Sequence, residues 1–455
     1  MALDLSDEEF RGLAARVVDL ASVHLESLAD RPIMPAVTGA EAERAFDRAI
    51  PEDGLGAAAI DQLEQIAALA RAGSAGFLGY VLGSGEPIGA LGDLYASILN
   101  QNVTAWRSSP SAVTIERALV SGLAEAIGCA GFTGLLTSGG SSANLMALAM
   151  ARESRLPANE QGSQPGIVYA SSETHMSVPK ALALLGLGRS ALRRIPVDDA
   201  FRISVDDLEA AIAEDRAAGR TPIAIVANAG TIVTGAIDPL ARLAAVAAAN
   251  DVWLHVDGAY GTPAALVRPE LFDGLDRADS VSLDGHKWLY QPVEVSMLLY
   301  RDATVARQTF SFTDDYARSL SDDPLEGFSF FDESLDLSRR FRALKLWLSL
   351  RYHGLAAFRA AIAADLEHAQ LLAALIEAEP DLELLAPVEL SAVCFRWVGG
   401  DDEANAALLQ RVNARGRVYL SNATVRGRFS LRACFVNHRS TEADVRAVVS
   451  EVLTA

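Results

Sequence analysis

The segments VWLHVDGAYG (252–261) and SVSLDGHKW (280–288) decide the class of fold. Each begins with a short apolar run and continues into small or ionisable residues. Similar apolar runs occur in GIVYAS (166–171), PIAIVAN (222–228) and VSMLLY (295–300). Alanine-rich stretches with helical spacing, at 205–219 and 239–249, lie between these runs. Strands that alternate with helices predict a mostly parallel central sheet, flanked by helices on both faces.

The two ends of the chain differ from this centre. Residues 1 to about 75 show apolar residues at helical spacing, without enough of them for a separate core. We expect these helices to pack on a partner subunit or on the main domain. The last stretch predicts a long helix (358–379), a closing helix (441–453) and three strands, CFRWV (394–398), RVYLS (417–421) and FSLRACFV (429–436).

A chain of 455 residues exceeds one ordinary compact core. We predict an N-terminal helical dimerisation segment (1–84), a large α/β domain (85–345) and a small C-terminal α+β domain (346–455).

Composition restricts the partners. The formal net charge of −20 argues against nucleic acid, since phosphate backbones require clustered cations. The three cysteines lie far apart and the seven histidines are scattered, so we expect a reduced, cytoplasmic protein without a metal. The acidic N-terminal sequence does not resemble a signal peptide, and the apolar run 222–228 is too short to cross a membrane.

Polar motifs follow the predicted strands. Ligands of open parallel sheets bind at the carboxyl ends of the strands. The residues found there are TSGGSS (137–142), SETH (172–175), NAGT (228–231), Asp257 and GHKW (285–288). At one edge they would assemble a lysine, a carboxylate, an imidazole and a glycine-rich nest.

Each of these features also has an ordinary structural interpretation. Gly139, Gly140 and Ser141 precede a predicted helix (143–153), where backbone N–H groups suit a phosphate but would equally begin any helix. Asp257 could hold a pyridine nitrogen protonated, or simply cap a turn. Lys287 could be a solvated surface residue.

The scarcity of lysine favours a special role for Lys287. The chain has three lysines and 36 arginines, so arginine serves wherever a positive charge suffices. Lysine, unlike arginine, can lose its proton and attack a carbonyl. The neighbouring His286 and a dry site would lower the lysine pKa. We expect Lys345 to be structural and Lys180 to lie on a helix surface.

The motifs resemble those of the group II amino-acid decarboxylases, which depend on pyridoxal 5′-phosphate (PLP) and are of the aromatic-L-amino-acid and glutamate decarboxylase type. This family has the fold type I architecture. The resemblance rests on TSGGSSANL (137–145), SSETHMSV (171–178), HVDGAYG (255–261), DGHKWLYQP (284–292) and LSRRFRALKLW (337–347). Ser142 and Gly258 depart from the common pattern, but both are small.

The resemblance implies a role for each matching residue. Lys287 would bind PLP as a Schiff base, Asp257 would pair with the pyridine nitrogen, and His175 would stack on the ring. Ala259 would pack on the opposite face and Thr231 near the ring substituents. The positions that match phosphate-binding residues are Gly139, Gly140, Ser141, Asp284 and His286.

The resemblance also implies a homodimer with its active sites at the subunit interface. Tyr316, in FTDDYARS (312–319), matches a loop tyrosine that reaches the neighbouring subunit's site and favours decarboxylation over aldehyde formation. Tyr80 and Trp106 fall near the expected substrate pocket. Arg432 resembles an arginine that approaches the substrate carboxylate in glutamate-type members.

The implied reaction is decarboxylation of an L-amino acid, an aromatic one first, to an amine and CO₂. Other PLP reactions on the same fold stay open: decarboxylation of glutamate, diaminobutyrate or cysteine sulfinate, aldehyde synthesis, and lyase chemistry. A catalytically silent scaffold protein is the alternative from a different class.

Overall fold

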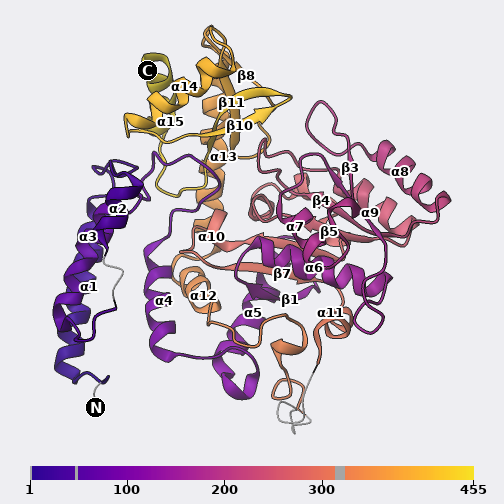
Figure 1. Cartoon of the computed structure of the whole chain (residues 1–455), viewed down its shortest axis with the longest axis horizontal. Coiled ribbons are helices and arrows are strands. Elements are labelled where there is room, and N and C mark those ends of the chain that lie inside the picture. The colour runs from indigo at the N-terminus through magenta and orange to yellow at the C-terminus, as the bar shows by residue number, and fades with distance from the viewer. Residues whose placement is uncertain (1–2, 47–49, 313–322) are drawn as a thin grey trace.

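A seven-stranded sheet forms the centre of the protein. The computed structural model describes residues 3–46, 50–312 and 323–455 (Figure 1). The strand order is β1-β7-β6-β5-β4-β2-β3. The strands are β1 (Thr133–Thr137), β2 (Ile167–Ser171), β3 (Leu192–Ile195), β4 (Pro222–Asn228), β5 (Trp253–Asp257), β6 (Ser280–Asp284) and β7 (Ser296–Tyr300).

The five predicted apolar runs are all strands of this sheet, namely β2, β4, β5, β6 and β7. Strands β6, β5, β4, β2 and β3 run parallel to one another, whereas β7 is antiparallel to both β6 and β1. Every residue of β4, β5, β6 and β7 is buried. Burial on both faces explains why these strands are continuous apolar runs rather than alternating patterns. The mostly parallel sheet of the predicted fold class is therefore confirmed.

Helices surround this sheet (Figure 1). They are α4 (Pro87–Leu99), α5 (Pro110–Ala126), α6 (Gly140–Arg155), α7 (Ser177–Leu184), α8 (Val205–Ala217), α9 (Leu240–Ala249), α10 (Gly285–Trp288), α11 (Ala303–Phe310) and α12 (Ala343–His353). Lys345 of α12 is fully buried, and its Nζ lies 2.8 Å from Asp93 Oδ2 of α4. The prediction of a structural Lys345 is confirmed, and Lys180 is exposed on α7 as expected.

A smaller antiparallel sheet lies near the C-terminus, in the order β10-β11-β9-β8. Its elements are α13 (Leu355–Glu377), β8 (Leu382–Leu384), β9 (Ala392–Trp397), α14 (Asp402–Ala414), β10 (Ser421–Val425), β11 (Arg428–Cys434) and α15 (Glu442–Thr454). The predicted small α+β unit is present in this form. Its division from the rest at 345/346, like that at 84/85, stays a prediction.

The strand predicted at 417–421 is wrong in its position along the chain. The strand of the small sheet begins only at Ser421. The backbone of Tyr419 pairs elsewhere: its N–H donates to the Gly76 carbonyl at 2.9 Å, and its carbonyl accepts the Leu78 N–H at 2.9 Å. The apolar run 417–421 therefore joins the N-terminal segment to the small sheet, and the more polar segment that follows it pairs with β11.

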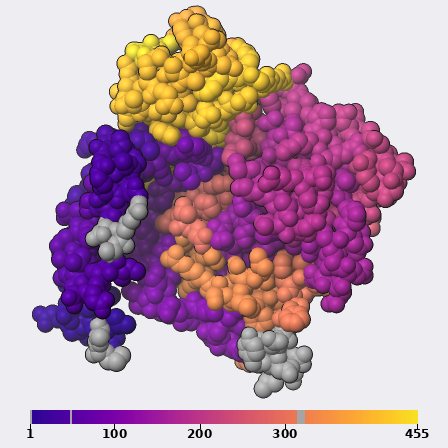
Figure 2. All heavy atoms as spheres, in the orientation of Figure 1, coloured from indigo at the N-terminus to yellow at the C-terminus, as the bar shows by residue number. Residues whose placement is uncertain are grey.

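In Figure 1 the N-terminal helices form a column beside α4, apart from both sheets, and in Figure 2 their indigo atoms lie along the left side of the molecule. They are α1 (Asp7–Glu26), α2 (Gly39–Ala45) and α3 (Gln62–Leu69), and none of them contains a buried residue. Apolar side chains of α1 such as Phe10, Val18 and Val23 are exposed. Within the described ranges, no helix combines the length and apolar character needed to cross a bilayer.

Candidate active site

A cavity of about 330 Å³ lies at the carboxyl ends of β4, β5 and β6 and the N-terminus of α6. Strand-to-helix turns place small or ionisable residues at this edge, as the sequence predicted. The predicted site residues that line the cavity are Tyr80, Gly139, Gly140, Ser141, His175, Asp257, Ala259, Asp284, His286 and Lys287. Residues separated by more than 200 positions in the chain thus share one cavity.

Lys287 lies on the short helix α10, directly after β6. Its Nζ is 2.8 Å from Asp284 Oδ2. The following residue, Trp288, is buried, donates from Nε1 to Asp365 Oδ2 at 2.9 Å and stacks on Tyr260. Because both ends of this turn are held, the lysine amine is directed into the cavity.

Glycine is required where the N-terminal segment passes the lysine turn. The N–H of Gly83 donates to the His286 carbonyl at 3.2 Å. A side chain at this position would overlap the backbone carbonyls of His286 and Lys287. The segment that carries Tyr80 and Val81 therefore lies directly against the lysine turn.

Asp257 is buried at the end of β5 and is surrounded by neutral donors. Asn144 Nδ2 donates to its Oδ2 at 2.7 Å. Ser282 Oγ and the Ala259 N–H both donate to its Oδ1 at 3.2 Å. Among the described residues, no lysine, arginine or histidine forms an ion pair with this carboxylate. Its negative charge is thus available to a cationic group in the cavity.

His175 also lines the cavity, from the turn before α7. Its Nδ1 lies 2.8 Å from Ser177 Oγ. Burial lowers the pKa of His175, although the nearby Asp257 carboxylate opposes this shift. The imidazole is therefore neutral near pH 7.

The start of α6 has the features of an anion site. This helix of 16 residues has no acidic residue in its first turn. A Cβ atom on Gly140 would lie 2.9 Å from Ala259 Cβ and 3.1 Å from the Asp284 carboxylate oxygens, so only glycine fits here. Backbone N–H groups at a helix N-terminus, approached closely through glycine, suit a phosphate group.

Three predicted residues do not line this cavity. Thr231 is buried beside it and bonds to Thr234 Oγ1 at 2.9 Å. Trp106 packs against the main core, half-buried. Arg432 of β11 donates from Nη1 to the Tyr80 carbonyl at 2.9 Å. Tyr316 lies outside the described residues.

Sequence reasoning missed Asn144 and Ser282, which hold Asp257, and Ile232, which lines the cavity. Asn144 stands in the quoted motif TSGGSSANL, but nothing local to the motif reveals its contact with β5. Gly258, noted as a departure, has a structural reason: a side chain there would overlap Thr262 Oγ1.

Comparison with known proteins agrees with this site. A sequence model described as the pyridoxal-dependent decarboxylase conserved domain matches residues 60–398. The chain belongs to the pyridoxal-dependent decarboxylase family. Its members require PLP, so this is a PLP-dependent carboxy-lyase of fold type I.

Several characterised family members resemble the whole chain. An aromatic-L-amino-acid decarboxylase of Bacillus atrophaeus is 34% identical over 470 residues, covering 99% of this chain and 96% of the relative. A 4-hydroxyphenylacetaldehyde synthase of Rhodiola rosea is 30% identical over 450 residues, covering 94% and 90%. The crystal structure of Oryza sativa TDC with PLP and tryptamine superposes with a TM-score of 0.92 at 27% identity, covering 99% of this chain and 98% of that one.

The residues that line this cavity fit PLP. The glycine-lined start of α6 accommodates a phosphate, and the unpaired charge of Asp257 suits a protonated pyridine nitrogen. Oδ1 of Asp284 is buried and has no hydrogen-bond partner among the described residues. This atom lies in the same cavity as the lysine amine, which is the group that must bond to the PLP aldehyde.

Proposed function

We propose that this protein decarboxylates an aromatic L-amino acid to its amine and CO₂, with Lys287 as the residue that binds PLP. The observation that carries the proposal is the single cavity that joins the Lys287 amine, the Asp257 carboxylate and the His175 imidazole. PLP, when bound, supplies an electron sink for the pair of electrons left by the departing carboxylate. The remaining work belongs to side chains of the protein.

In this proposal each residue has one task. Asp257 keeps the pyridine nitrogen protonated, because an anion in a cavity favours the cationic form of its neighbour. Residues 139–141 and His286 hold the phosphate, while His175 and Ala259 contact the two faces of the ring. Thr231 supports the turn beside Ile232. Asp284, whose contact is with the lysine amine, orients Lys287.

Tyr80 and Ile232 support an aromatic substrate. Both line the cavity and both are exposed, Tyr80 by 54% and Ile232 by 41%. Exposed apolar groups at a cavity mouth gain free energy when an aromatic side chain covers them. Among the relatives, those named above act on aromatic compounds according to their names, which supports the same substrate class.

A second candidate is decarboxylation of an acidic amino acid. Arg432 is almost fully buried next to the Tyr80 segment, and its Nη2 has no hydrogen-bond partner among the described residues. A buried guanidinium with a spare donor suits a substrate carboxylate. A shift of the segment around Tyr80 would be needed to expose it.

The quaternary structure and location are also proposals. We propose a homodimer in which the exposed apolar side chains of α1 and those of α4, such as Leu91, Leu94 and Ile98, meet a second copy. Tyr316 would then serve the active site of the second copy, while Trp106 stays a proposed substrate-pocket residue. We propose a cytoplasmic location, because Cys129, Cys394 and Cys434 are buried free thiols. Light scattering and cell fractionation test these two points.

The decisive experiment compares the wild type with Lys287→Ala. Purified wild type should be yellow, with an absorption band that the variant lacks, and should release CO₂ from an aromatic amino acid. A panel containing tyrosine, tryptophan, phenylalanine, glutamate and cysteine sulfinate identifies the substrate. Release of ammonia and peroxide together with CO₂ would instead indicate aldehyde synthesis. A colourless wild type that takes up no PLP would contradict the proposal.

A further inference from the structure

Asn144, in the second turn of α6, has an unusual set of contacts. The residue is 1% exposed, and its amide bonds to three residues on two other elements. Nδ2 donates to Asp257 Oδ2 of β5 at 2.7 Å and to Ser177 Oγ of α7 at 2.9 Å. Oδ1 lies 3.0 Å from Nε2 of His255, also on β5. The amide nitrogen thus donates twice, and the amide oxygen has one partner.

The contacts extend in both directions from Asn144. On one side, His255 Nδ1 lies 2.9 Å from Ser280 Oγ, which also accepts from Trp253 Nε1 at 2.9 Å. On the other side, Ser177 Oγ lies 2.8 Å from His175 Nδ1. One chain of hydrogen bonds therefore runs from the interior of the sheet to the cavity.

The fixed donors and acceptors among these residues determine the direction of each hydrogen bond. The Asp257 carboxylate can only accept, so the amide nitrogen of Asn144 must face it and the amide oxygen must face His255. His255 Nε2 therefore carries the proton. Burial lowers the pKa of His255 to about 4, so the ring is neutral and its Nδ1 accepts from Ser280. Trp253, which can only donate, completes the chain at its inner end.

Ser177 connects these hydrogen bonds to His175. Ser177 Oγ accepts from Asn144, so its own proton is free to be donated to His175 Nδ1. The Ser177 backbone N–H also points to this nitrogen, at 3.2 Å. His175 Nδ1 is thus an acceptor, and the ring proton lies on Nε2.

We propose that Asn144 is a positioning residue that holds Asp257 and, through Ser177, His175 in fixed orientations, so that His175 carries its proton on Nε2. This inference rests on the proposed function, since it concerns the two residues assigned to the PLP ring. One amide side chain would thereby link Asp257, assigned to the pyridine nitrogen of PLP, to His175, assigned to a face of the PLP ring. Asn144 lines the same cavity, and in this proposal its amide acts through Asp257 and Ser177.

Asn144→Leu is the main test, because leucine has a similar size and no hydrogen-bonding group. We expect the Kd for PLP to rise by about 10-fold or more, as is typical when a charged group loses a buried hydrogen bond. The pH dependence of the absorption band of lysine-bound PLP should also shift, because Asp257 loses its shortest hydrogen bond.

Asn405→Leu is the matched control. Asn405 is fully buried in α14 and bonds through both amide atoms, including the Trp397 N–H at 2.9 Å, but it lies in the small C-terminal unit. We expect a lower Tm with an unchanged absorption band and unchanged PLP affinity. An equal loss of PLP affinity in both variants would show that general destabilisation is responsible, and would overturn the proposal.

The orientation of His175 is tested separately by ¹⁵N NMR of histidine-labelled holoenzyme. The expected signal is that of an imidazole protonated at Nε2, and Ser177→Ala should shift it toward a mixture of both neutral forms while Ser177→Thr restores it. A ring protonated at Nδ1 in the wild type would overturn the proposal. If Asn144→Leu does not fold, this NMR measurement still tests the proposal.

Failure of this inference differs from failure of the proposed function. A wild type without a Lys287-dependent absorption band contradicts the proposed function. A wild type with that band, together with a folded Asn144→Leu variant of wild-type PLP affinity and spectral pH dependence, contradicts only the role of Asn144.

Discussion

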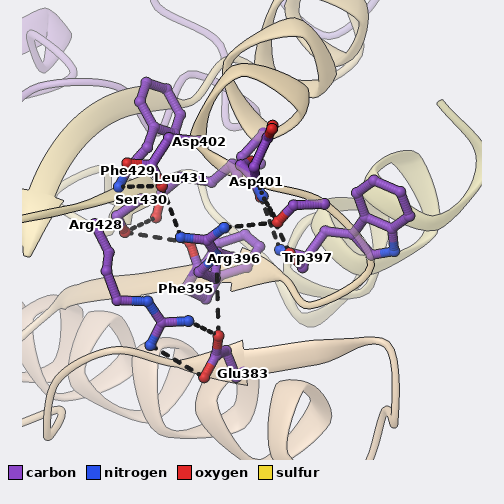
Figure 3. Close-up of polar contacts among 12 residues, drawn as sticks. Glu383, Phe395, Arg396, Trp397, Asp401, Asp402, Arg428, Phe429, Ser430 and Leu431 are labelled. Carbon is purple, nitrogen blue, oxygen red and sulfur yellow. Dashed lines mark hydrogen bonds and ion pairs between the residues drawn. The ribbon is translucent and has the colours of Figure 1, made fainter.

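Asp257 and Arg396 are both buried, but the polar groups around them balance charge in opposite ways. Arg396 of β9 donates from Nη1 to Asp402 Oδ1 at 2.8 Å, and Glu383 of β8 pairs with Arg428 of β11, on the other side of β9 (Figure 3). Each cation there has an anion. Asp257, in contrast, receives only neutral donors from the described residues.

This difference separates a network that stabilises from a network that binds. Burying a charge is costly unless an opposite charge or several hydrogen bonds compensate for it. Around Arg396, ion pairs between residues of the small C-terminal unit compensate for the buried charge. The Asp257 group leaves one negative charge facing a cavity, where a cationic ligand can neutralise it.

The largest expected effect is that of Asp257→Asn. The amide keeps the size of the side chain and removes its charge, so we expect kcat to fall by about 100-fold or more, as for other losses of electrostatic stabilisation. Steady-state kinetics measure the change. Asp402→Asn, the corresponding change in the Arg396 network, should leave kcat unchanged. Equal kcat in Asp257→Asn and the wild type would contradict the contrast between the two regions.

Arg396→Met should act on stability alone. Arg396 is buried, whereas its partner Asp402 is half-exposed and can be solvated after the change. We expect the free energy of unfolding to fall by about 1–2 kcal/mol, less than for a fully buried pair. Urea unfolding measures this loss, and the absorption spectrum of bound PLP should not change. A spectral change would show that the two networks communicate.

Asp365→Asn extends the comparison to a second carboxylate with neutral donors. Asp365 accepts from Trp288 Nε1 and from the Tyr290 hydroxyl at 2.8 Å. Burial raises its pKa to about 7, so the native state binds a proton that the unfolded chain releases at about pH 4. This group therefore contributes stability that decreases as the pH rises from about 4 to 7.

Asparagine cannot titrate, so this decrease should be smaller in the variant by roughly 1 kcal/mol or more. Urea unfolding of both proteins at pH 5 and pH 8 measures the difference. The same pH dependence in both proteins would show that another group is responsible.

The smallest effect is expected for Arg428→Ala. Arg428 pairs with Glu383 at the surface of the small sheet, and its side chain is about half-exposed. Exposed pairs contribute about 0–1 kcal/mol and are screened by salt. Unfolding in low and high salt should therefore give a small difference that shrinks as salt is added. A loss of several kcal/mol would mean that this pair stabilises the sheet as a buried one does.

Much of the fold and the site could be predicted because the signals are local. The strand runs are short, apolar and buried on both faces, and the motif around Lys287 follows one of them directly. The edge strand β3 was missed because its sequence, LRRI, contains two arginines. The register of the last strands was missed because Tyr419 pairs with Gly76 and Leu78, which lie more than 300 residues away in the chain.

The sequence by itself determined most of the strands and helices along the chain, the lysine that binds PLP in our proposal, and the family. These depend on residue type and spacing, which are properties of neighbouring residues. Only the tertiary structure decided that Asn144 joins Asp257, His255 and Ser177, and that Arg432 contacts the Tyr80 segment. Such contacts depend on how distant segments pack, because a hydrogen bond requires atoms within about 3 Å of each other, and no local pattern encodes that distance.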